Sequence, residues 1–172
     1  KYGYTTTDEQ LLVSATEIVK ACQNMAKNDV GALIIIAPTE IPAHILDTGT
    51  ALDATISCGL LESIFNTKAP LHDGAVVVLG DRIISAGCFL PLSQEVTLAK
   101  DLGTRHRAAI GITEESDVFA IVVSEESGII SVVQGGTIKR YMTPEKLLEE
   151  IKVIYRISSQ SAARRGKKSQ KN

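Results

Sequence analysis

The chain has 172 residues, of which 44% are hydrophobic, 4% are aromatic and none is tryptophan. This length is typical of one domain with a single core of aliphatic side chains. The net charge of −2 hides an asymmetry: residues 151–172 contain seven Lys or Arg and no Asp or Glu, so residues 1–150 carry −2 − 7 = −9. So acidic a body argues against nonspecific nucleic-acid binding, which depends on neutralising phosphates.

The sequence contains no secretory signal and no run of the roughly 18 apolar residues that a membrane span requires. Because the chain begins at Lys1 rather than at methionine, we expect a soluble piece of a longer protein whose N-terminal part could hold a membrane anchor. Its cysteines, Cys22, Cys58 and Cys88, form no CxxC pair. They are typical of small core residues in a reducing cytoplasm.

The first elements have clear boundaries. Thr7 and Gln10 form a capping-box pattern, which predicts a helix from there to about Asn28. Residues 31–37 are apolar throughout, which is typical of a central strand buried on both faces. Residues 38–50 contain two prolines and are predicted to be a loop with an ordinary surface histidine, His44.

A short strand is predicted at 52–56, followed by a helix that Ser57 caps and that ends near Asn66. The run of three valines and a leucine at 76–79 predicts a buried strand. A short turn at Gly80 joins it to a second strand at 82–89, which indicates a hairpin. We expect residues 94–103 to form a loop with a short helix that leads into the next helix.

That helix is expected to continue to the acidic residues 114–117. Buried strands are predicted at 118–123 and 129–133, a further strand at 137–141, and a last helix with Pro144 at its first position. The order of elements predicts one α/β (α+β) domain, residues 1–157, with a mixed, largely antiparallel sheet flanked by helices. Residues 158–172 are predicted to be a disordered basic tail.

Polar groups precede the strand at 76–79. Asp73 is the leading metal ligand, since magnesium and manganese prefer carboxylate and triphosphate oxygens. His72 could bind a softer metal, manganese or cobalt, or orient Asp73. Gly74 and Ala75 have little bulk and could let an adenosine approach the backbone.

A second polar stretch, from Gly103 to Arg107, opens a predicted helix. Its hydroxyl, imidazole and two guanidiniums beside a helix N-terminus suit an anion, above all phosphate. Successive helical side chains point about 100° apart. We therefore expect Thr104 and one or two of Arg105, His106 and Arg107 to contact phosphate, while a remaining arginine could stabilise the fold or a second subunit.

Two further segments could complete a nucleotide site. Ser124, Glu125 and Glu126 follow a predicted strand, where Ser124 could bind phosphate and Glu126 could give the metal a second carboxylate. An acidic, solvated turn explains these residues equally well. Phe89 and Leu90 end the hairpin, and their apolar faces could sandwich an adenine.

The stretches HDGA, GTRHRAAIGITEESD and VVSEESGIISV, in this order, resemble the diadenylate cyclases over roughly Val30 to Ile138. The resemblance implies condensation of two ATP into cyclic di-AMP with release of two pyrophosphates, in a transient homodimer that needs a divalent metal (manganese, magnesium or cobalt). It also implies a parent protein anchored at the cytoplasmic face of a bacterial membrane, with a regulatory protein as a potential partner.

The resemblance and the residue chemistry together define the expected site. Expected catalytic residues are Asp73, Thr104, Arg105, His106 and Arg107. Expected nucleotide-binding residues are Gly74, Ala75, Phe89, Leu90, Gly103, Thr104, Ser124 and Glu125. Expected metal ligands are Asp73, His72 and Glu126.

Two other functions stay open from the residues alone. A nucleotide-binding sensor without turnover would use the same basic pocket, and a hydrolase would release AMP or ADP instead of a cyclic dinucleotide. The sequence lacks both GxSxG and the GxxxxGK[ST] phosphate loop. This argues against covalent catalysis and favours positioning with electrostatic stabilisation.

Overall fold

The computed structural model of the protein describes residues 6–93 and 102–157. The expected tail at 158–172 and most of the segment expected at 94–103 lie outside these residues. The helices are α1 (Asp8–Lys27), α2 (Ala43–Leu46), α3 (Cys58–Phe65), α4 (Thr104–Glu115) and α5 (Pro144–Ile154). The strands are β1 (Ala32–Ala37), β2 (Thr50–Thr55), β3 (Ala75–Leu79), β4 (Arg82–Cys88), β5 (Phe119–Val123), β6 (Ile130–Gln134) and β7 (Thr137–Lys139).

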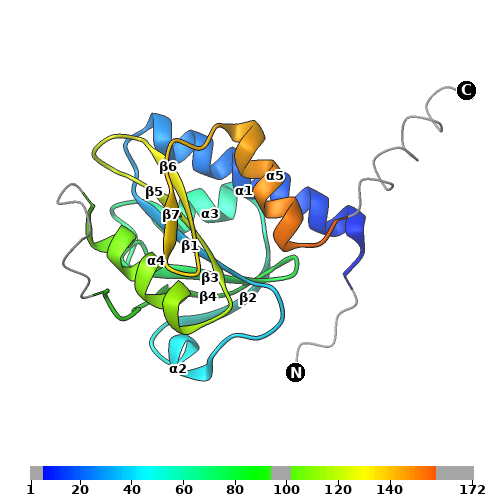
Figure 1. Cartoon of the computed structure of the whole chain (residues 1–172), viewed down its shortest axis with the longest axis horizontal. Coiled ribbons are helices and arrows are strands. Elements are labelled where there is room, and N and C mark those ends of the chain that lie inside the picture. The colour runs from blue at the N-terminus through cyan, green and yellow to red at the C-terminus, as the bar shows by residue number, and fades with distance from the viewer. Residues whose placement is uncertain (1–5, 94–101, 158–172) are drawn as a thin grey trace, which may run out of the picture.

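One seven-stranded sheet runs through the described residues in the order β2-β4-β3-β1-β5-β6-β7 (Figure 1). Strands β1 and β3 are parallel, and every other neighbouring pair is antiparallel. The predicted mixed, largely antiparallel sheet is therefore confirmed, as is the β3–β4 hairpin.

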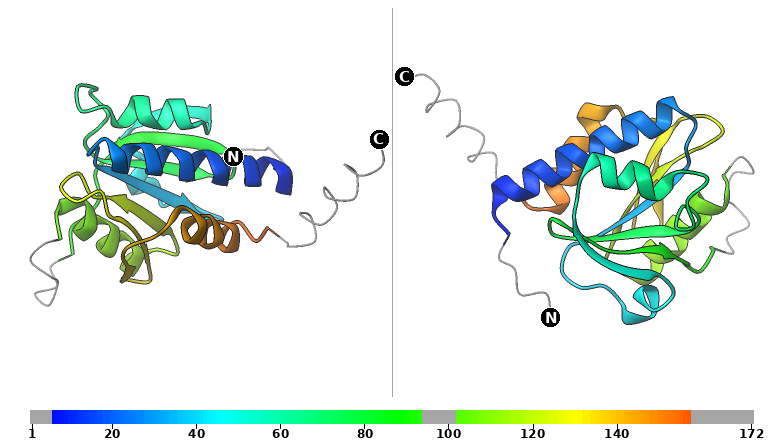
Figure 2. Two further views of the ribbon diagram at one scale, coloured as in Figure 1. Left: turned by 90° about the horizontal axis from the view of Figure 1, so that it is seen from above. Right: turned by 180° about the vertical axis from the view of Figure 1, so that it is seen from behind.

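Helices cover both faces of the sheet, which makes three layers (Figure 2). Helices α1, α3 and α5 pack on one face, and α4 with the short α2 packs on the other. Side chains of β1 alternate between the two cores: Ile34 and Ile36 join the α1 side, whereas Leu33 and Ile35 join the α4 side. Burial on both faces is the reason that the strand is apolar throughout.

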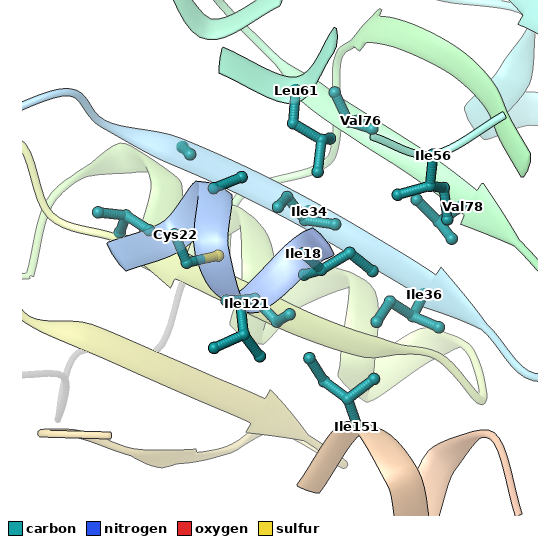
Figure 3. Packing of buried hydrophobic residues seen from close by; sticks show 14 of the residues in the cluster. Ile18, Cys22, Ile34, Ile36, Ile56, Leu61, Val76, Val78, Ile121 and Ile151 are labelled. Atoms are coloured by element: carbon teal, nitrogen blue, oxygen red, sulfur yellow. The ribbon is translucent and has the colours of Figure 1, made fainter. Parts of the chain in front are cut away.

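The larger core consists of aliphatic side chains, as the composition predicts. Figure 3 shows Ile18 and Cys22 of α1 facing Ile34 of β1 and Ile121 of β5, with Ile151 of α5 beside them. All five side chains are 0% exposed. This packing fixes the sheet that carries the site described below.

Side-chain caps start three helices where the sequence predicts them. The Thr7 hydroxyl accepts from the Gln10 N–H at 3.2 Å, and Gln10 Oε1 accepts from the Thr7 N–H at 2.9 Å, which completes the capping box. Ser57 caps α3 in the same way, and Thr143 caps α5 just before Pro144.

Two local predictions are wrong. Residues 38–50 are not all loop, because they contain α2, whose Ile45 is 1% exposed and anchors the segment on the sheet. The last predicted strand is shorter than 137–141: β7 ends at Lys139, and Tyr141 has a φ of 62° that does not belong in a strand. In the first case the packing of Ile45 on the sheet stabilises a short helix where the prolines indicated a loop. In the second case the left-handed backbone at Tyr141 ends the strand early.

Candidate active site

The topology brings the distant polar motifs to one edge of the sheet. Because β1 and β3 are parallel, Gly31 and Gly74, which precede these strands, lie at the same edge. Antiparallel pairing places the end of β4 beside the start of β3, with Ala75 opposite Cys88. It likewise places the end of β5 beside the start of β1. The segments after β4 and β5 therefore meet the HDGA stretch there.

Gly74 is required by the backbone. Its φ is +114°, a conformation that side chains rarely adopt, and an added Cβ would lie 2.8 Å from the carbonyl carbon of Gly87 and 2.9 Å from the Cys88 oxygen. The close approach of two chain segments fixes the start of β3. Asp73, immediately before it, is exposed. Ala75 is fully buried within β3 and lines neither cavity described below.

A first cavity, of about 100 Å³, lies beside Asp73. It brings together the end of β4, the HDGA stretch and the first turn of α4. Its lining includes six of the expected site residues: Asp73, Gly74, Phe89, Leu90, Thr104 and Arg105. Its apolar lining is completed by Leu33, Leu92, Ala108 and Cys88, which are not among the expected site residues.

A second cavity, of about 200 Å³, adjoins the first, because Thr104 and Arg105 line both. Its wall consists of the first turn of α4 and the turn after β5. The lining residues are Leu102, Gly103, Thr104, Arg105, His106, Val123, Ser124, Glu125 and Glu126. Together the two cavities contain most of the expected catalytic and nucleotide-binding residues.

The N-terminus of α4 supplies donors to the second cavity. Gly103 is the N-cap residue and has no side chain to satisfy the first N–H groups of this 12-residue helix. These groups and the helix dipole favour a negatively charged ligand. A phosphate group fits the chemistry of this position.

The four residues Thr104 to Arg107 have different surroundings, as the helical periodicity predicts. Thr104 and Arg105 line both cavities, and His106 lines the second from a position that is only 5% exposed. Arg107 lines neither cavity. Its carbonyl oxygen accepts from the Ser93 N–H at 3.1 Å, which ties the segment after Leu90 to α4.

The turn after β5 is held by its own backbone. The Ser124 N–H donates to the Ile129 carbonyl at 3.0 Å, and the Gly128 N–H donates to the Ser124 carbonyl at 2.9 Å. Ser124 is half-buried, while Glu125 and Glu126 are exposed. Glu125 Oε2 lies 3.7 Å from Arg105 Nη1, so this ion pair joins the turn to α4.

The three expected metal ligands are not gathered into one site within the chain. No group of three or more His, Cys, Asp or Glu side chains suited to a metal occurs among the described residues. Asp73 lines the first cavity and Glu126 the second, whereas His72 lines neither.

His72 nevertheless has a defined tautomer. Its Nδ1 lies 2.7 Å from the Ala69 carbonyl oxygen, which can only accept, so Nδ1 carries the proton. In a neutral imidazole Nε2 then carries the lone pair, which is the tautomer that can bind a metal through Nε2.

Cys88 is a buried thiol in the wall of the first cavity. Burial raises its pKa, and the hydrogen bond to the Ser85 hydroxyl, at 3.3 Å, opposes this shift. The thiol therefore stays protonated at neutral pH and contributes apolar surface to the cavity. The alternation of residues along β1 and β4 was the one signal that could have identified Leu33 and Cys88 as lining residues.

Comparisons with known proteins identify the family of the chain. The DAC family model, described as DisA bacterial checkpoint controller nucleotide-binding, matches residues 19–138. A cyclic di-AMP synthase, CdaA, of Bacillus subtilis is 41% identical over 88% of this chain and 56% of its own length. A diadenylate cyclase of Listeria monocytogenes is 47% identical over 86% of this chain and 54% of its own length. The chain thus spans about half the length of these relatives.

Solved structures support the same assignment. DacA from Staphylococcus aureus, crystallised as a double mutant, is similar with a TM-score of 0.79 and 42% identity, over 86% of this chain and 96% of that one. A hypothetical membrane-spanning protein from Bacillus cereus has a TM-score of 0.72, also at 42% identity, over 76% and 64% of the two chains. None of the helices within residues 6–93 and 102–157 has the length and apolarity to cross a membrane. On the match of the family model over most of its length and on its likeness to DacA in sequence and fold, the chain belongs to the DAC family, described as DisA bacterial checkpoint controller nucleotide-binding.

Proposed function

We propose that this chain is the catalytic domain of a diadenylate cyclase, which condenses two ATP into cyclic di-AMP and releases two pyrophosphates. The observation that carries the proposal is the adjacency of the two cavities. A carboxylate, Asp73, lines one cavity, the N-terminus of α4 lines the other, and Thr104 and Arg105 belong to both. The names of the curated relatives support the same reaction.

In this proposal the triphosphate lies along the N-terminus of α4. The Thr104 hydroxyl, the Arg105 guanidinium and the N–H groups in the first turn of the helix bind its oxygens and stabilise the negative charge that develops on the leaving pyrophosphate. Ser124 adds a hydrogen bond from the other wall. The adenosine extends into the first cavity, where Phe89 and Leu90 contact the base and the backbone at Gly74 lies beside the sugar.

The reaction itself needs two nucleotides. The 3′-oxygen of one adenosine forms a bond to the α-phosphorus of the other ATP, and the bond from that phosphorus to the β-phosphate bridging oxygen breaks. The same exchange at the second phosphorus closes the ring. Each 3′-hydroxyl loses its proton, and the Asp73 carboxylate in the wall of the first cavity is a candidate acceptor for it.

A divalent metal (manganese, magnesium or cobalt) fits the residues present. Magnesium-type ions are commonly held by one or two carboxylates together with substrate phosphates, so a complete protein cage is not required. Asp73 would hold the ion with triphosphate oxygens, and the Nε2 of His72 and the carboxylate of Glu126 are the further candidate ligands. When bound, such an ion polarises the phosphate and lowers the pKa of a coordinated hydroxyl.

We propose that two chains act together, because the product is two-fold symmetric and each chain supplies one HDGA stretch and one α4 N-terminus. Two sites facing each other would present each 3′-hydroxyl to the other nucleotide. The net charge of −9 on residues 1–150 opposes stable association, so the active dimer is expected to be transient.

The longer parent protein is proposed to be anchored at the cytoplasmic face of the bacterial membrane, where a regulatory protein could act on it. The size of the relatives and the membrane-spanning neighbour support the anchor. An anchor would raise the local concentration of chains and so favour the transient dimer.

The deciding experiment is chromatography of the products after incubation with ATP and manganese. Formation of a cyclic dinucleotide together with two pyrophosphates for each product molecule supports the proposal. ATP binding without pyrophosphate release would favour the sensor, and release of AMP or ADP would favour a hydrolase.

A further inference from the structure

Gly31 lies directly before β1, at the edge of the sheet where the two cavities meet, and it is buried. A glycine at this place would ordinarily be explained as the residue that ends α1 in a left-handed conformation. Here Asp29 has that role, with a φ of 54°, and the Val30 N–H donates to the Met25 carbonyl at 2.9 Å to close the helix end. Gly31 itself is not among the glycines with positive φ. Its backbone would therefore accept a side chain.

The surrounding space would accept one only if the Arg105 side chain moved aside. A Cβ added to Gly31 would lie 2.8 Å from Cζ of Arg105, and Nη1 of Arg105 would be closer still. It would also lie 3.2 Å from Cβ of Glu125. The planar guanidinium of Arg105 thus occupies the volume in which a side chain at position 31 would stand.

Two contacts fix this guanidinium at the junction of the cavities. The bare backbone of Gly31 lies against one part of it, and the Glu125 carboxylate lies 3.7 Å from Nη1. Its Nε is buried and makes no hydrogen bond within the described part of the chain. The position of the guanidinium therefore depends on the room that Gly31 leaves.

We infer that Gly31 is a positioning residue for Arg105: the absence of a side chain admits the guanidinium to the place from which it reaches both cavities. The inference rests on the proposed function insofar as Arg105 binds triphosphate. The inference gives Gly31 a functional role, whereas the sequence pattern indicates only that a strand begins there.

The test is a double-mutant cycle of Gly31→Ala and Arg105→Ala, with ATP binding measured by calorimetry on wild type, both single variants and the double variant. In the wild-type background Gly31→Ala should weaken ATP binding by about tenfold, the effect of losing one charge-assisted hydrogen bond. In the Arg105→Ala background it should change binding by less than about twofold, because no guanidinium remains to be displaced. Gly59→Ala is the matched control, since its Cβ would meet nothing within 4 Å, and binding should be unchanged.

Thermal unfolding of the same proteins, without ATP, checks the steric relationship separately. Gly31→Ala should lower the melting temperature more in the wild-type background than in Arg105→Ala. If the single variant does not fold and the double variant does, the relationship is supported. Failure of both to fold, or an equal loss of ATP binding in both backgrounds, would overturn the inference, because Gly31 would then serve the fold alone. Product analysis of the wild type tests the proposed reaction independently of these outcomes.

Discussion

The hydroxyl of Thr48, from the segment after α2, accepts a hydrogen bond from the Phe89 N–H at 3.0 Å and donates one to the Ile45 carbonyl at 2.9 Å. Residues 41 positions apart in the chain are joined by this one oxygen. Phe89 is 63% exposed and lines the first cavity, so few packing contacts of its own hold it. The position of the proposed adenine contact is therefore set by Thr48.

Replacing Thr48 by valine keeps the shape and removes the hydroxyl. We expect ATP affinity to fall by about two- to tenfold, since a hydrogen bond contributes about 0.5–1.5 kcal/mol net. Thr48→Ser keeps the hydroxyl and should restore affinity. Thr16→Val is the control, because the Thr16 hydroxyl bonds only within α1, to the Leu12 carbonyl. Calorimetry on the four proteins would refute the assignment if valine and serine gave equal affinities.

Asp73→Asn removes the charge of the proposed metal ligand at almost constant volume. Because Asp73 is exposed, the fold and the melting temperature should not change. Formation of cyclic dinucleotide should fall by at least about a hundredfold, as expected when an interaction with the reacting centre worth about 3 kcal/mol is lost. The measurement is the initial rate of pyrophosphate release with saturating manganese. Near-normal turnover by a folded Asp73→Asn variant would contradict the role of Asp73 as a metal ligand.

A face-to-face mechanism makes activity depend on protein concentration. Turnover per chain should rise with concentration before it saturates, because a single chain carries one nucleotide site. Mixing an excess of Asp73→Asn chains with wild type should depress activity below the value for simple dilution, since mixed dimers would lack one functional carboxylate. Specific activity that stays constant at concentrations far below a measured dimerisation constant would contradict the mechanism.

The Cys58 thiol, which lines neither cavity, offers a pH-dependent probe of the fold. Its Sγ donates to Glu62 Oε2 at 3.2 Å. Burial, followed by this hydrogen bond and the negative charge of Glu62, raises the pKa of Cys58 to about 11 from an ordinary value of 9.0. A raised pKa means that the folded state prefers the protonated thiol. The stability that this provides is complete below pH 9 and is lost as the pH rises through about 11.

The same shift predicts slow alkylation. At pH 8.5, iodoacetamide should modify Cys58 far more slowly in the folded protein than in urea, because the thiolate fraction falls about tenfold for each unit of pKa. Glu62→Gln keeps the size of the side chain and removes its charge, so it should speed the reaction. Peptide mass spectrometry identifies the modified cysteine. An unchanged rate in Glu62→Gln would show that access alone limits the reaction.

Much of this protein is determined by local sequence. The capping residues Thr7, Ser57 and Thr143 start their helices where the pattern predicts, because a cap hydrogen bond is a contact between near neighbours. The run of β1 is also predictable locally. Every residue in it is apolar, so side chains on both faces of the strand must be buried. The HDGA and GTRHR motifs also identify the family from the chain alone.

The arrangement of the site was decided by tertiary structure. Only the pairing of β1 with β3 and β5 determines that Gly31, Asp73 and Ser124 meet at one edge of the sheet, and pairing between distant strands leaves no local trace. Tertiary packing also determines that Arg105 lines both cavities and that Arg107 lines neither, although both residues are arginines. Tertiary packing likewise places the Arg105 guanidinium in the volume beside Gly31. Helical periodicity determines that neighbouring side chains point in different directions. Which of them lines a cavity depends on the segments that pack against the helix.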